Sequence, residues 1–322
     1  MTGSVVTPAT YDCRKAFADE LISLARADAR IVAVCNDSVG SSNLVAFREE
    51  FPDRMINVGI AEQDLVGVSA GLANVGLIPF VSAAAPFLTG RALEQIKADA
   101  AYSQAHLVLC GQSPGMAYGE LGPTHHSIED LSWMRAIADL TVLVPAGPAQ
   151  TRAAMRWAVD NHGPCYIRIG RFPVPETSPA TDGPVFEPGA AVRLADGDDV
   201  TVIAIGSMVS RALTAADRLR TEGVGVRVLN MASVEPLDVR SVLDAARETS
   251  GIVTVEEATV TGGLGAAVAT VLAQQHPTRM RILGVPSEFA PTASTEYLLD
   301  YFGLNADGII NAVRELLADN GR

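Results

Sequence analysis

The chain has 322 residues, of which 48% are hydrophobic, and its 24 basic and 37 acidic residues give a net charge of −13 at pH 7. This length favours about two domains, and the hydrophobic fraction excludes an intrinsically disordered chain. An acidic chain with no run of Lys or Arg is a poor candidate for binding nucleic acid or an anionic membrane, although a local basic pocket could still take an anionic small substrate.

The first half of the chain alternates segments with strand-like and helix-like patterns of hydrophobic residues. Strands are predicted at residues 31–35, 55–58, 78–82, 106–110, 141–145 and 165–169, and helices at 14–26, 60–75, 91–102 and 148–162. A further helix is predicted to begin at Ser127, with Asp130 three residues later as an approximate capping box. Strands and helices that take turns in this way indicate an α/β fold with a mainly parallel sheet.

A proline-rich stretch, Phe172–Gly189, interrupts this alternation. It contains five prolines and two glycines and has no apolar periodicity, which is typical of a linker. We therefore expect a first domain over residues 1–175, a linker over 176–188 and a smaller α/β domain over 189–322. In the second domain, strands are predicted at residues 200–205, 226–230, 251–256 and 280–285, and helices at 209–221, 238–249, 264–276 and 306–317.

The cysteines and the N-terminus bear on the cellular compartment. Cys13, Cys35, Cys110 and Cys165 are far apart and form no C-x-x-C pair, so neither a disulfide framework nor a thiolate zinc site is expected. Residues 1–10 contain no charged segment followed by an apolar one, and no apolar run approaches the ~18–20 residues of a membrane span. We expect a cytoplasmic protein.

One glutamate follows a short predicted strand and a glycine turn, in the segment Asn57-Val-Gly-Ile-Ala-Glu62-Gln63. Glu62 falls in the first turn of the next predicted helix, where many glutamates merely stabilise the helix dipole. Its neighbours, however, are almost all apolar residues or glycine, which predicts a desolvated carboxylate with a raised pKa. Because such a group can share a proton with a ring nitrogen, Glu62 is a candidate catalytic residue.

Four segments, in chain order, resemble the transketolase family. Residues 57–71, NVGIAEQDLVGVSAG, resemble the catalytic-glutamate segment of its pyrimidine-binding domain. Residues 80–91 resemble its aromatic segment, and Gly122-Pro-Thr-His-His126 resembles its substrate motif. The 189–322 region, with Val255-Glu-Glu and Gly262-Gly-Leu-Gly265, resembles its C-terminal domain. The resemblance implies a thiamine-diphosphate-binding fold followed by a smaller transketolase C-terminal domain.

The resemblance also implies which side chains hold the cofactor. Glu62 matches the family's glutamate that hydrogen-bonds a pyrimidine ring nitrogen of thiamine diphosphate, a bond that would be short and charge-assisted in a desolvated site. Phe87 matches the ring that stacks on the aminopyrimidine and fixes its orientation. Asp37, at the end of a predicted strand, matches an active-site aspartate.

A second group of residues matches positions that contact substrate. His125 matches the histidine that contacts the donor and the covalent intermediate, so we assign it a catalytic and a substrate-binding role. Arg14, Ser42 and Arg171 match positions that bind the sugar phosphate, which suits arginine because it can bind phosphate through two nitrogens. Ser41 is the alternative to Ser42 if the match is shifted by one residue.

The chain departs from the family pattern at several of these positions. Leu121 stands where many transketolases have an aspartate that reads a hydroxyl of the donor sugar, and leucine cannot accept a hydrogen bond. This substitution predicts a branched or otherwise altered ketose phosphate as donor. Two further aromatic residues of the cofactor site are replaced by Ala84 and Gly90, which predicts a pocket wall built from other side chains.

One segment of full-length transketolases, the G-D-G…N segment that binds Mg²⁺ and the diphosphate, is not found in this sequence. The resemblance therefore implies the C-terminal subunit of a split transketolase, with the metal on an N-terminal partner subunit and an α2β2 assembly that transfers a two-carbon ketol unit between sugar phosphates. Two alternatives stay open: the β subunit of a 2-oxo-acid dehydrogenase E1 component, and a non-catalytic scaffold or regulatory subunit that has kept the fold.

Overall fold

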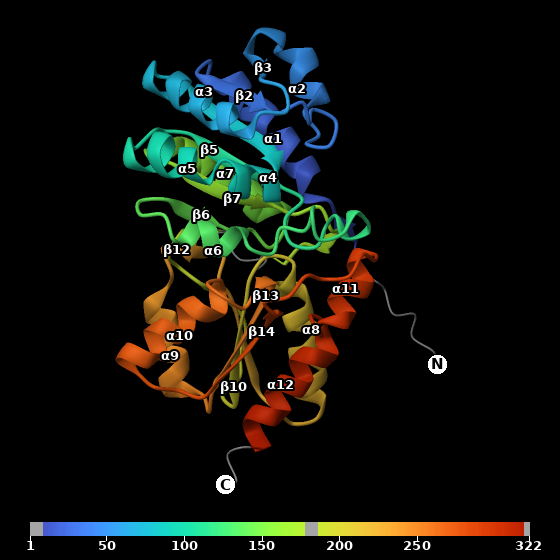
Figure 1. The fold of residues 1–322 in the computed structure, drawn as a ribbon. Helices are drawn as coiled ribbons and strands as arrows, with labels where there is room; N and C mark the ends of the chain where they lie inside the picture. Colours follow the sequence, from blue (N-terminus) through green and yellow to red (C-terminus); the bar gives the residue numbers. More distant parts are fainter. Residues whose placement is uncertain (1–8, 178–185, 319–322) are drawn as a thin grey trace.

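The computed structural model describes residues 9–177 and 186–318, which form two α/β domains stacked end to end (Figure 1). The predicted fold class, two domains with mainly parallel sheets flanked by helices, is confirmed. Residues 178–185, which make up most of the linker expected over 176–188, lie outside the described residues. No helix in the described ranges is long and apolar enough to cross a membrane.

Among the described residues, the sheet of the first domain has seven strands in the order β12-β6-β7-β5-β4-β2-β3. Six of them run parallel: β2 Ile31–Cys35, β3 Met55–Asn57, β4 Ile78–Ala84, β5 Val108–Gln112, β6 Thr141–Leu143 and β7 Cys165–Ile169. The edge strand β12, Ser233–Glu235, comes from the second half of the chain and pairs antiparallel with β6. The sequence does not predict β12, because three residues carry no periodic signal.

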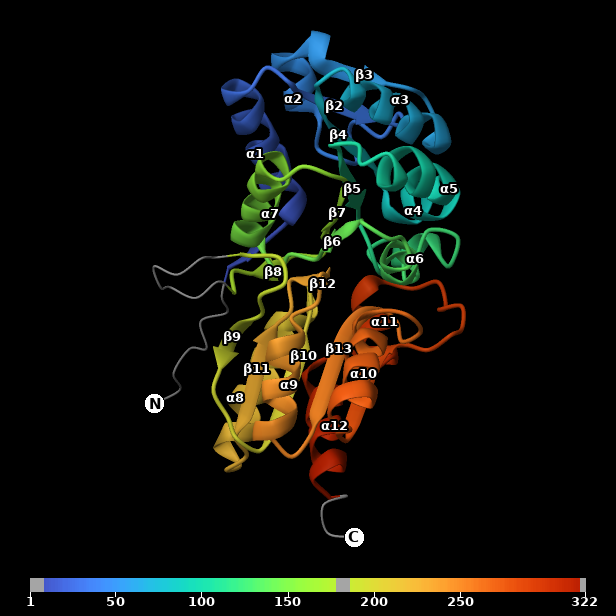
Figure 2. The same ribbon diagram turned by 90° about the vertical axis from the view of Figure 1, so that its left-hand side faces the viewer.

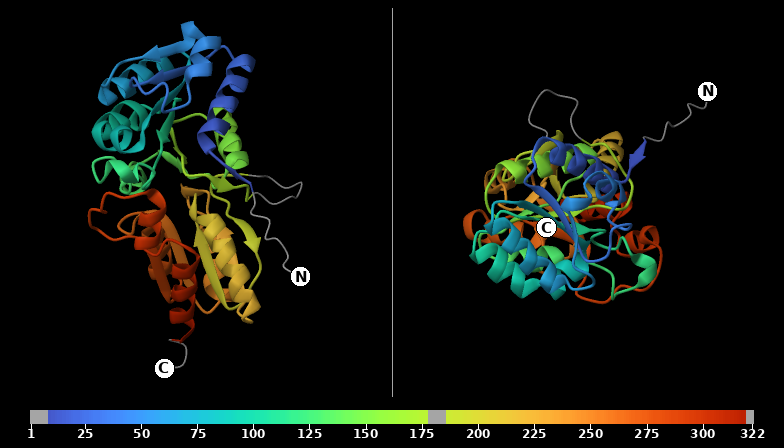
Figure 3. Two further views of the ribbon diagram at one scale, coloured as in Figure 1. Left: turned by 90° about the vertical axis from the view of Figure 1, so that its right-hand side faces the viewer. Right: turned by 90° about the horizontal axis from the view of Figure 1, so that it is seen from above.

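Helices cover both faces of this sheet (Figures 2 and 3). One face packs against α1 Cys13–Ala27, α2 Val45–Glu50 and α7 Pro148–Asp160. The other face packs against α3 Glu62–Asn74, α4 Ala85–Arg91, α5 Leu93–Gln95 and α6 Asp130–Arg135. The helix predicted over 91–102 is present from Leu93 to Tyr102, as α5 followed directly by a π-helical segment, Ile96–Tyr102, and it is separated from α4, which ends at Arg91.

The five-stranded sheet of the second domain has the order β14-β13-β10-β11-β9. Its strands are β9 Val192–Ala195, β10 Val200–Ala204, β11 Val226–Asn230, β13 Ile252–Thr259 and β14 Met280–Val285, of which only β9 is antiparallel to its neighbour. One face carries α8 Met208–Thr221 and α12 Ala306–Ala318, and the other carries α9 Val239–Glu248 and α10 Leu264–Gln275. The short helix α11, Thr295–Tyr301, was not predicted and lies beside the first domain (Figure 1).

The proline-rich stretch is not irregular throughout. Its residues Val174–Pro175 form β8, which pairs antiparallel with β1, Thr10–Tyr11, at the start of the described chain. This pairing places the end of the first domain beside its beginning. The chain therefore leaves the first domain next to α1, where Arg14 lies.

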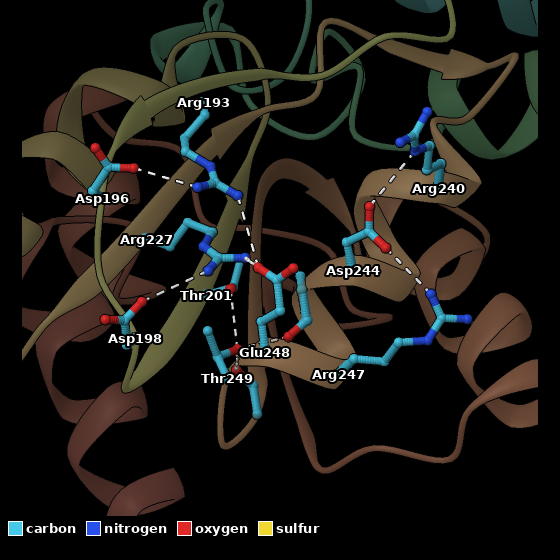
Figure 4. A network of polar contacts seen from close by, with 12 residues as sticks. Arg193, Asp196, Asp198, Thr201, Arg227, Arg240, Asp244, Arg247, Glu248 and Thr249 are labelled. Atoms are coloured by element: carbon cyan, nitrogen blue, oxygen red, sulfur yellow. Dashed lines mark hydrogen bonds and ion pairs between the residues drawn. The ribbon is translucent and has the colours of Figure 1, made fainter.

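A polar network closes the far end of the second domain, at the amino ends of β10 and β11 (Figure 4). Arg227, whose side chain is buried, donates a hydrogen bond to a Glu248 carboxylate oxygen at 2.7 Å. The Thr201 and Thr249 hydroxyls lie 3.1 Å apart. Because ligands bind parallel sheets at the opposite, carboxyl ends of the strands, this network stabilises the domain and forms no site.

The two domains are joined by a buried network at the carboxyl ends of their strands. Arg168 on β7 donates to both Asp130 carboxylate oxygens at 2.9 Å and to the Glu257 carbonyl oxygen at 2.9 Å, and the Tyr166 hydroxyl donates to Asp130 at 2.7 Å. The capping box predicted from Ser127 and Asp130 is therefore wrong. A buried arginine needs a carboxylate partner, and Asp130 serves that purpose in place of capping a helix.

Candidate active site

A cavity of about 500 Å³ opens at the carboxyl ends of β2 and β4. Open parallel sheets bind ligands at this edge. Four segments meet there: the loop after β2, the turn into α3, the beginning of α4, and the loop over residues 118–125. The walls are formed by Asn36, Asp37, Ser38, Ser41, Ile60, Glu62, Ala84, Phe87, Arg91, Tyr118, Leu121 and His125.

Glu62 is the first residue of α3 and is only 1% exposed. One of its carboxylate oxygens accepts a hydrogen bond from the Asn36 side-chain amide at 2.7 Å, and the other accepts one from the Arg91 guanidinium at 2.5 Å. The preceding Gly59 has a φ of +77°, which glycine adopts without strain and which lets the chain turn from β3 into the helix. The predicted burial of this carboxylate at a helix start is confirmed.

The expected rise in the pKa of Glu62 is wrong. Burial does raise the pKa of this carboxyl, but the hydrogen bonds from Arg91 and Asn36 lower it by more, so that the pKa lies below its ordinary value. Apolar neighbours in the sequence indicate desolvation correctly, but they do not reveal a cation 29 positions away. In this arrangement Glu62 is a charged carboxylate.

Two aromatic residues and a histidine form the adjoining wall of the cavity. The Phe87 ring meets the His125 ring edge to face, with centroids 5.2 Å apart, and the Tyr118 and His125 centroids are 6.2 Å apart. The Thr124 hydroxyl lies 3.0 Å from Nδ1 of His125, so it can fix the orientation of the imidazole. Phe87, His125 and Glu62, which are far apart in sequence, thus face one cavity, as their predicted roles require.

The second domain holds the loop that carries His125. The backbone N–H of Ala293 donates to the Gly119 carbonyl oxygen at 3.2 Å, and the Thr295 hydroxyl donates to the Met116 carbonyl oxygen at 2.9 Å. A Cβ at Gly119 would lie 2.4 Å from the Ala293 carbonyl oxygen. Only glycine therefore lets this loop come so close to the segment that precedes α11. Replacing or moving α11 would therefore displace a wall of the cavity.

The neighbouring His126 does not face the cavity. It is 4% exposed and lies 3.3 Å from the Gly119 carbonyl oxygen through Nε2. Burial lowers the pKa of His126, which favours the neutral imidazole. Its contact with the backbone indicates that it supports the loop.

The loop after β2 brings Asp37 and Ser41 to the cavity, but not Ser42. Asp37 has a φ of +69°, and its carboxylate accepts a hydrogen bond from the Asn57 amide at 3.0 Å. The Ser42 side chain is fully buried, with its hydroxyl 3.3 Å from that of Ser38. Ser41 lines the cavity, and its carbonyl oxygen accepts a hydrogen bond from Arg14 at 3.0 Å. Of the two serines that the sequence offers for this role, Ser41 faces the cavity and Ser42 does not.

Leu121 belongs to the cavity wall, whereas Arg171 lies just outside the cavity. Leu121 lines the cavity and is 54% exposed. The Arg171 guanidinium carbon lies 5.2 Å from the centroid of the Tyr118 ring, whose residue also lines the cavity, while Arg171 itself lines an adjacent cleft between the domains. Arg171 is thus separated from the cavity by one aromatic ring.

Five cavity residues were not among the site residues predicted from the sequence: Asn36, Ser38, Ile60, Arg91 and Tyr118. Asn36 directly follows a buried strand, which is a usable signal because loops after parallel strands carry ligand-binding groups. Arg91 ends the aromatic segment and Tyr118 precedes the substrate motif, but nothing in their spacing predicts contact with Glu62 or His125.

The two positions that lack the family's aromatic residues have different surroundings. Ala84 lines the cavity and leaves it open. A Cβ at Gly90 would lie 2.9 Å from the Trp133 ring, so this position has no room for a side chain. The expectation that other side chains build this wall is met by Arg91, whose guanidinium carbon lies 4.8 Å from the Phe87 ring centroid.

Comparisons with known proteins agree with this architecture. A family model described as the transketolase pyrimidine-binding domain matches residues 9–175, and one described as the transketolase C-terminal domain matches residues 189–309. The chain is 42% identical to a subunit of the apulose-4-phosphate transketolase of Phocaeicola vulgatus, over 95% of this chain and 97% of that protein. It is 39% identical to the 6-deoxy-6-sulfo-D-fructose transketolase subunit SqwH of Clostridium sp., over 94% of each chain. A solved structure described as a split gene transketolase, an inactive beta4 tetramer, is 40% identical, with a TM-score of 0.88 over 95% of this chain and 98% of that one.

Proposed function

The chain belongs to the transketolase family, and from this membership we propose that it is the C-terminal subunit of a thiamine-diphosphate-dependent transketolase that transfers a two-carbon ketol unit between sugar phosphates. The observation that carries the proposal is the convergence of Glu62, Phe87 and His125 on one cavity at the carboxyl edge of the sheet. The names of the relatives, both transketolase subunits, support the same activity and give no support to an E1 β subunit.

The cavity fits the pyrimidine half of the cofactor. A flat ring with basic nitrogens needs a buried carboxylate as partner and an aromatic surface on which to stack, and Glu62 and Phe87 provide these on adjacent walls. When bound, thiamine diphosphate supplies the carbon nucleophile that attacks the donor's carbonyl group. In our proposal Glu62 holds a proton near the pyrimidine, Phe87 orients the ring and Asp37 borders the cofactor site.

His125 is the chain's candidate for proton transfer to the substrate. Its imidazole lines the cavity next to the Phe87 ring, and Thr124 can fix its orientation. A histidine so placed can donate a proton to, or accept one from, a substrate hydroxyl. We assign His125 to the donor substrate and to the intermediate formed from it.

The phosphate end of the substrate needs positive charge, which is scarce in a chain of net charge −13. Arg171 at the Tyr118 ring and Arg14 at the Ser41 carbonyl lie beside residues of the cavity wall, whereas Arg91 lines the cavity but is paired with Glu62. Arg171 can bind a phosphate through two nitrogens, and Arg14 can do so once it leaves Asp12, with which it is paired at 2.6 Å. We propose that both serve the sugar phosphate, together with the serine at position 41 or 42.

The leucine at position 121 favours a donor sugar that differs from the common ketose phosphates. Its exposed side chain offers the cavity only apolar surface, where a carboxylate would read a sugar hydroxyl. The relatives in Phocaeicola vulgatus and Clostridium sp. are named for apulose 4-phosphate and 6-deoxy-6-sulfo-D-fructose, neither of which is a common ketose phosphate. We propose a branched or otherwise modified ketose phosphate as donor for this chain.

The cofactor's diphosphate and Mg²⁺ require a second polypeptide in this proposal. Within residues 9–177 and 186–318, no group of three or more His, Cys, Asp or Glu side chains could hold a metal ion. The relatives are named as subunits, and one solved relative made of β chains alone is described as inactive. We propose an N-terminal transketolase subunit as partner, in an α2β2 assembly in the cytoplasm.

A ketol-transfer assay tests the proposal. The chain is co-purified with its N-terminal partner and supplied with thiamine diphosphate, Mg²⁺, an aldose phosphate and a panel of common and branched ketose phosphates. We expect turnover with at least one ketose phosphate by the complex and none by this chain alone. Oxidative turnover of a 2-oxo acid would identify an E1 component instead, and turnover of neither class would support a non-catalytic subunit.

A further inference from the structure

One side chain makes both of the contacts that the cofactor's pyrimidine would make. The Arg91 guanidinium donates a hydrogen bond to Glu62 at 2.5 Å, and its central carbon lies over the Phe87 ring, 4.8 Å from the centroid. A guanidinium is a planar group with N–H donors at its edge, so it can hydrogen-bond a carboxylate while a face rests on an aromatic ring. An aminopyrimidine is likewise flat, and its ring nitrogen can donate a hydrogen bond to a carboxylate when that nitrogen carries the shared proton.

We propose that Arg91 is an internal stand-in for the pyrimidine: it occupies Glu62 and Phe87 in the cofactor-free chain and leaves them when thiamine diphosphate binds. This inference rests on the function proposed above. It deepens that function by giving the site a residue that competes with the cofactor. The same ion pair keeps Glu62 charged, so its loss on binding also frees the carboxyl to share a proton.

The surroundings of Arg91 give it a second place to lie. Arg91 is the last residue of α4, its side chain is 48% exposed, and it also lines a neighbouring groove of about 760 Å³. Glu94, an exposed residue three positions further on, borders the same groove. Because both side chains line this groove, the Glu94 carboxylate offers the guanidinium a second partner when Glu62 releases it.

Titration calorimetry on the two-subunit complex with Mg²⁺ and thiamine diphosphate tests the proposal. Arg91→Ala removes the competitor, and we expect about threefold to fivefold tighter cofactor binding, the effect of losing one partly exposed ion pair. Lys97→Ala is the matched control, because it removes the same charge from the same groove without touching Glu62. In a Glu62→Gln background, where the ion pair is already lost, Arg91→Ala should have no further effect on affinity.

Several results would overturn the inference. Unchanged or weaker cofactor binding by Arg91→Ala would show that Arg91 does not compete, and an equal gain from Lys97→Ala would show a general charge effect. If the alanine variant fails to fold, Arg91→Lys carries the test, since lysine keeps the charge but has no planar group to lie on Phe87; it should bind the cofactor more tightly than the wild type. A wild-type complex that binds no cofactor would refute the proposed function and this inference with it.

Discussion

Each domain buries a glutamate beside the start of a helix that follows a strand, and the two sites differ in what surrounds the carboxylate. Glu62 begins α3, faces a cavity and is paired with Arg91 and Asn36. Glu256 on β13 is 0% exposed and accepts hydrogen bonds from the backbone N–H groups of Leu264 and Gly265 at the start of α10, at 2.7 and 2.8 Å. Both carboxylates thus use a helix start, but only Glu62 lines a cavity that can admit a ligand.

The two environments shift the carboxyl groups in opposite directions. Side-chain hydrogen bonds outweigh burial at Glu62 and lower its pKa, whereas burial outweighs two backbone hydrogen bonds at Glu256 and raises its pKa to about 7. A shifted pKa alone would therefore have selected Glu256 as the catalytic residue. The comparison teaches that access to a cavity, and a partner that can be exchanged for a ligand, distinguish the functional carboxylate from the structural one.

The largest effect is expected from Glu62→Gln. Glutamine keeps the size of the side chain and one acceptor oxygen but cannot share a proton, so we expect turnover by the two-subunit complex to fall by about 10²–10⁴-fold. The matched control is Asp64→Asn, which removes a charge from the same helical turn at an exposed position. Steady-state ketol transfer measures both variants. Near-normal turnover by Glu62→Gln would make Glu62 a structural residue like Glu256.

Glu256→Gln should instead change how stability depends on pH. The folded pKa of about 7 lies above the ordinary value of 4.5, so the folded state holds the proton more tightly than the unfolded state. The contribution of Glu256 to the free energy of unfolding is fully present below pH 4.5. It falls by up to about 1.4 kcal/mol per pH unit between pH 4.5 and pH 7.

Denaturant unfolding of the Glu256→Gln variant at pH 4.5, 6 and 7.5 should show this fall removed, while the variant keeps its turnover. Glu288→Gln, at an exposed position, is the control and should leave the pH profile unchanged. A wild-type profile that rises from pH 4.5 to 7 because of Glu256 would contradict the assigned direction of the pKa shift.

Arg171→Ala tests the proposed contact with the sugar phosphate beside the Glu62 cavity. The loss of one charge-assisted contact should cost roughly 1.5–3 kcal/mol, which raises KM for phosphorylated substrates by about 10–100-fold and leaves KM for unphosphorylated analogues nearly unchanged. Arg240→Ala, on α9 with a side chain 92% exposed, is the control for a general loss of charge. Equal effects on both kinds of substrate would assign Arg171 a structural role at the Tyr118 ring.

The smallest effect is expected from Leu121→Asp. A carboxylate at this cavity wall can accept a hydrogen bond from a donor hydroxyl, so the ratio of kcat/KM for xylulose 5-phosphate to that for the native donor should rise, by roughly tenfold for one discriminating contact. Ile60→Asp places the same charge elsewhere on the cavity wall and should leave this ratio unchanged. A wild-type complex that already prefers xylulose 5-phosphate, with no gain in Leu121→Asp, would mean that another group reads the hydroxyl.

The alternating α/β pattern can be predicted from the sequence alone, and so can the first and last residues of several strands. Strands β2, β7, β11 and β14 have the predicted ends, because short runs rich in apolar residues mark parallel strands. The first three are buried throughout, whereas the edge strand β14 is mostly half-buried. The same patterns place Glu62 at a helix start.

Only the tertiary structure decided which partners each side chain meets. β12 joins the sheet of the other domain, Asp130 pairs with Arg168 on β7, and Arg91 reaches Glu62 across 29 residues. Ser41 rather than Ser42 faces the cavity for the same reason, since one residue of register in a loop reverses which side chain is buried. Local patterns report how much of a residue is covered, whereas its pKa and its chemistry depend on the charge that covers it, which is set by contacts between distant parts of the chain.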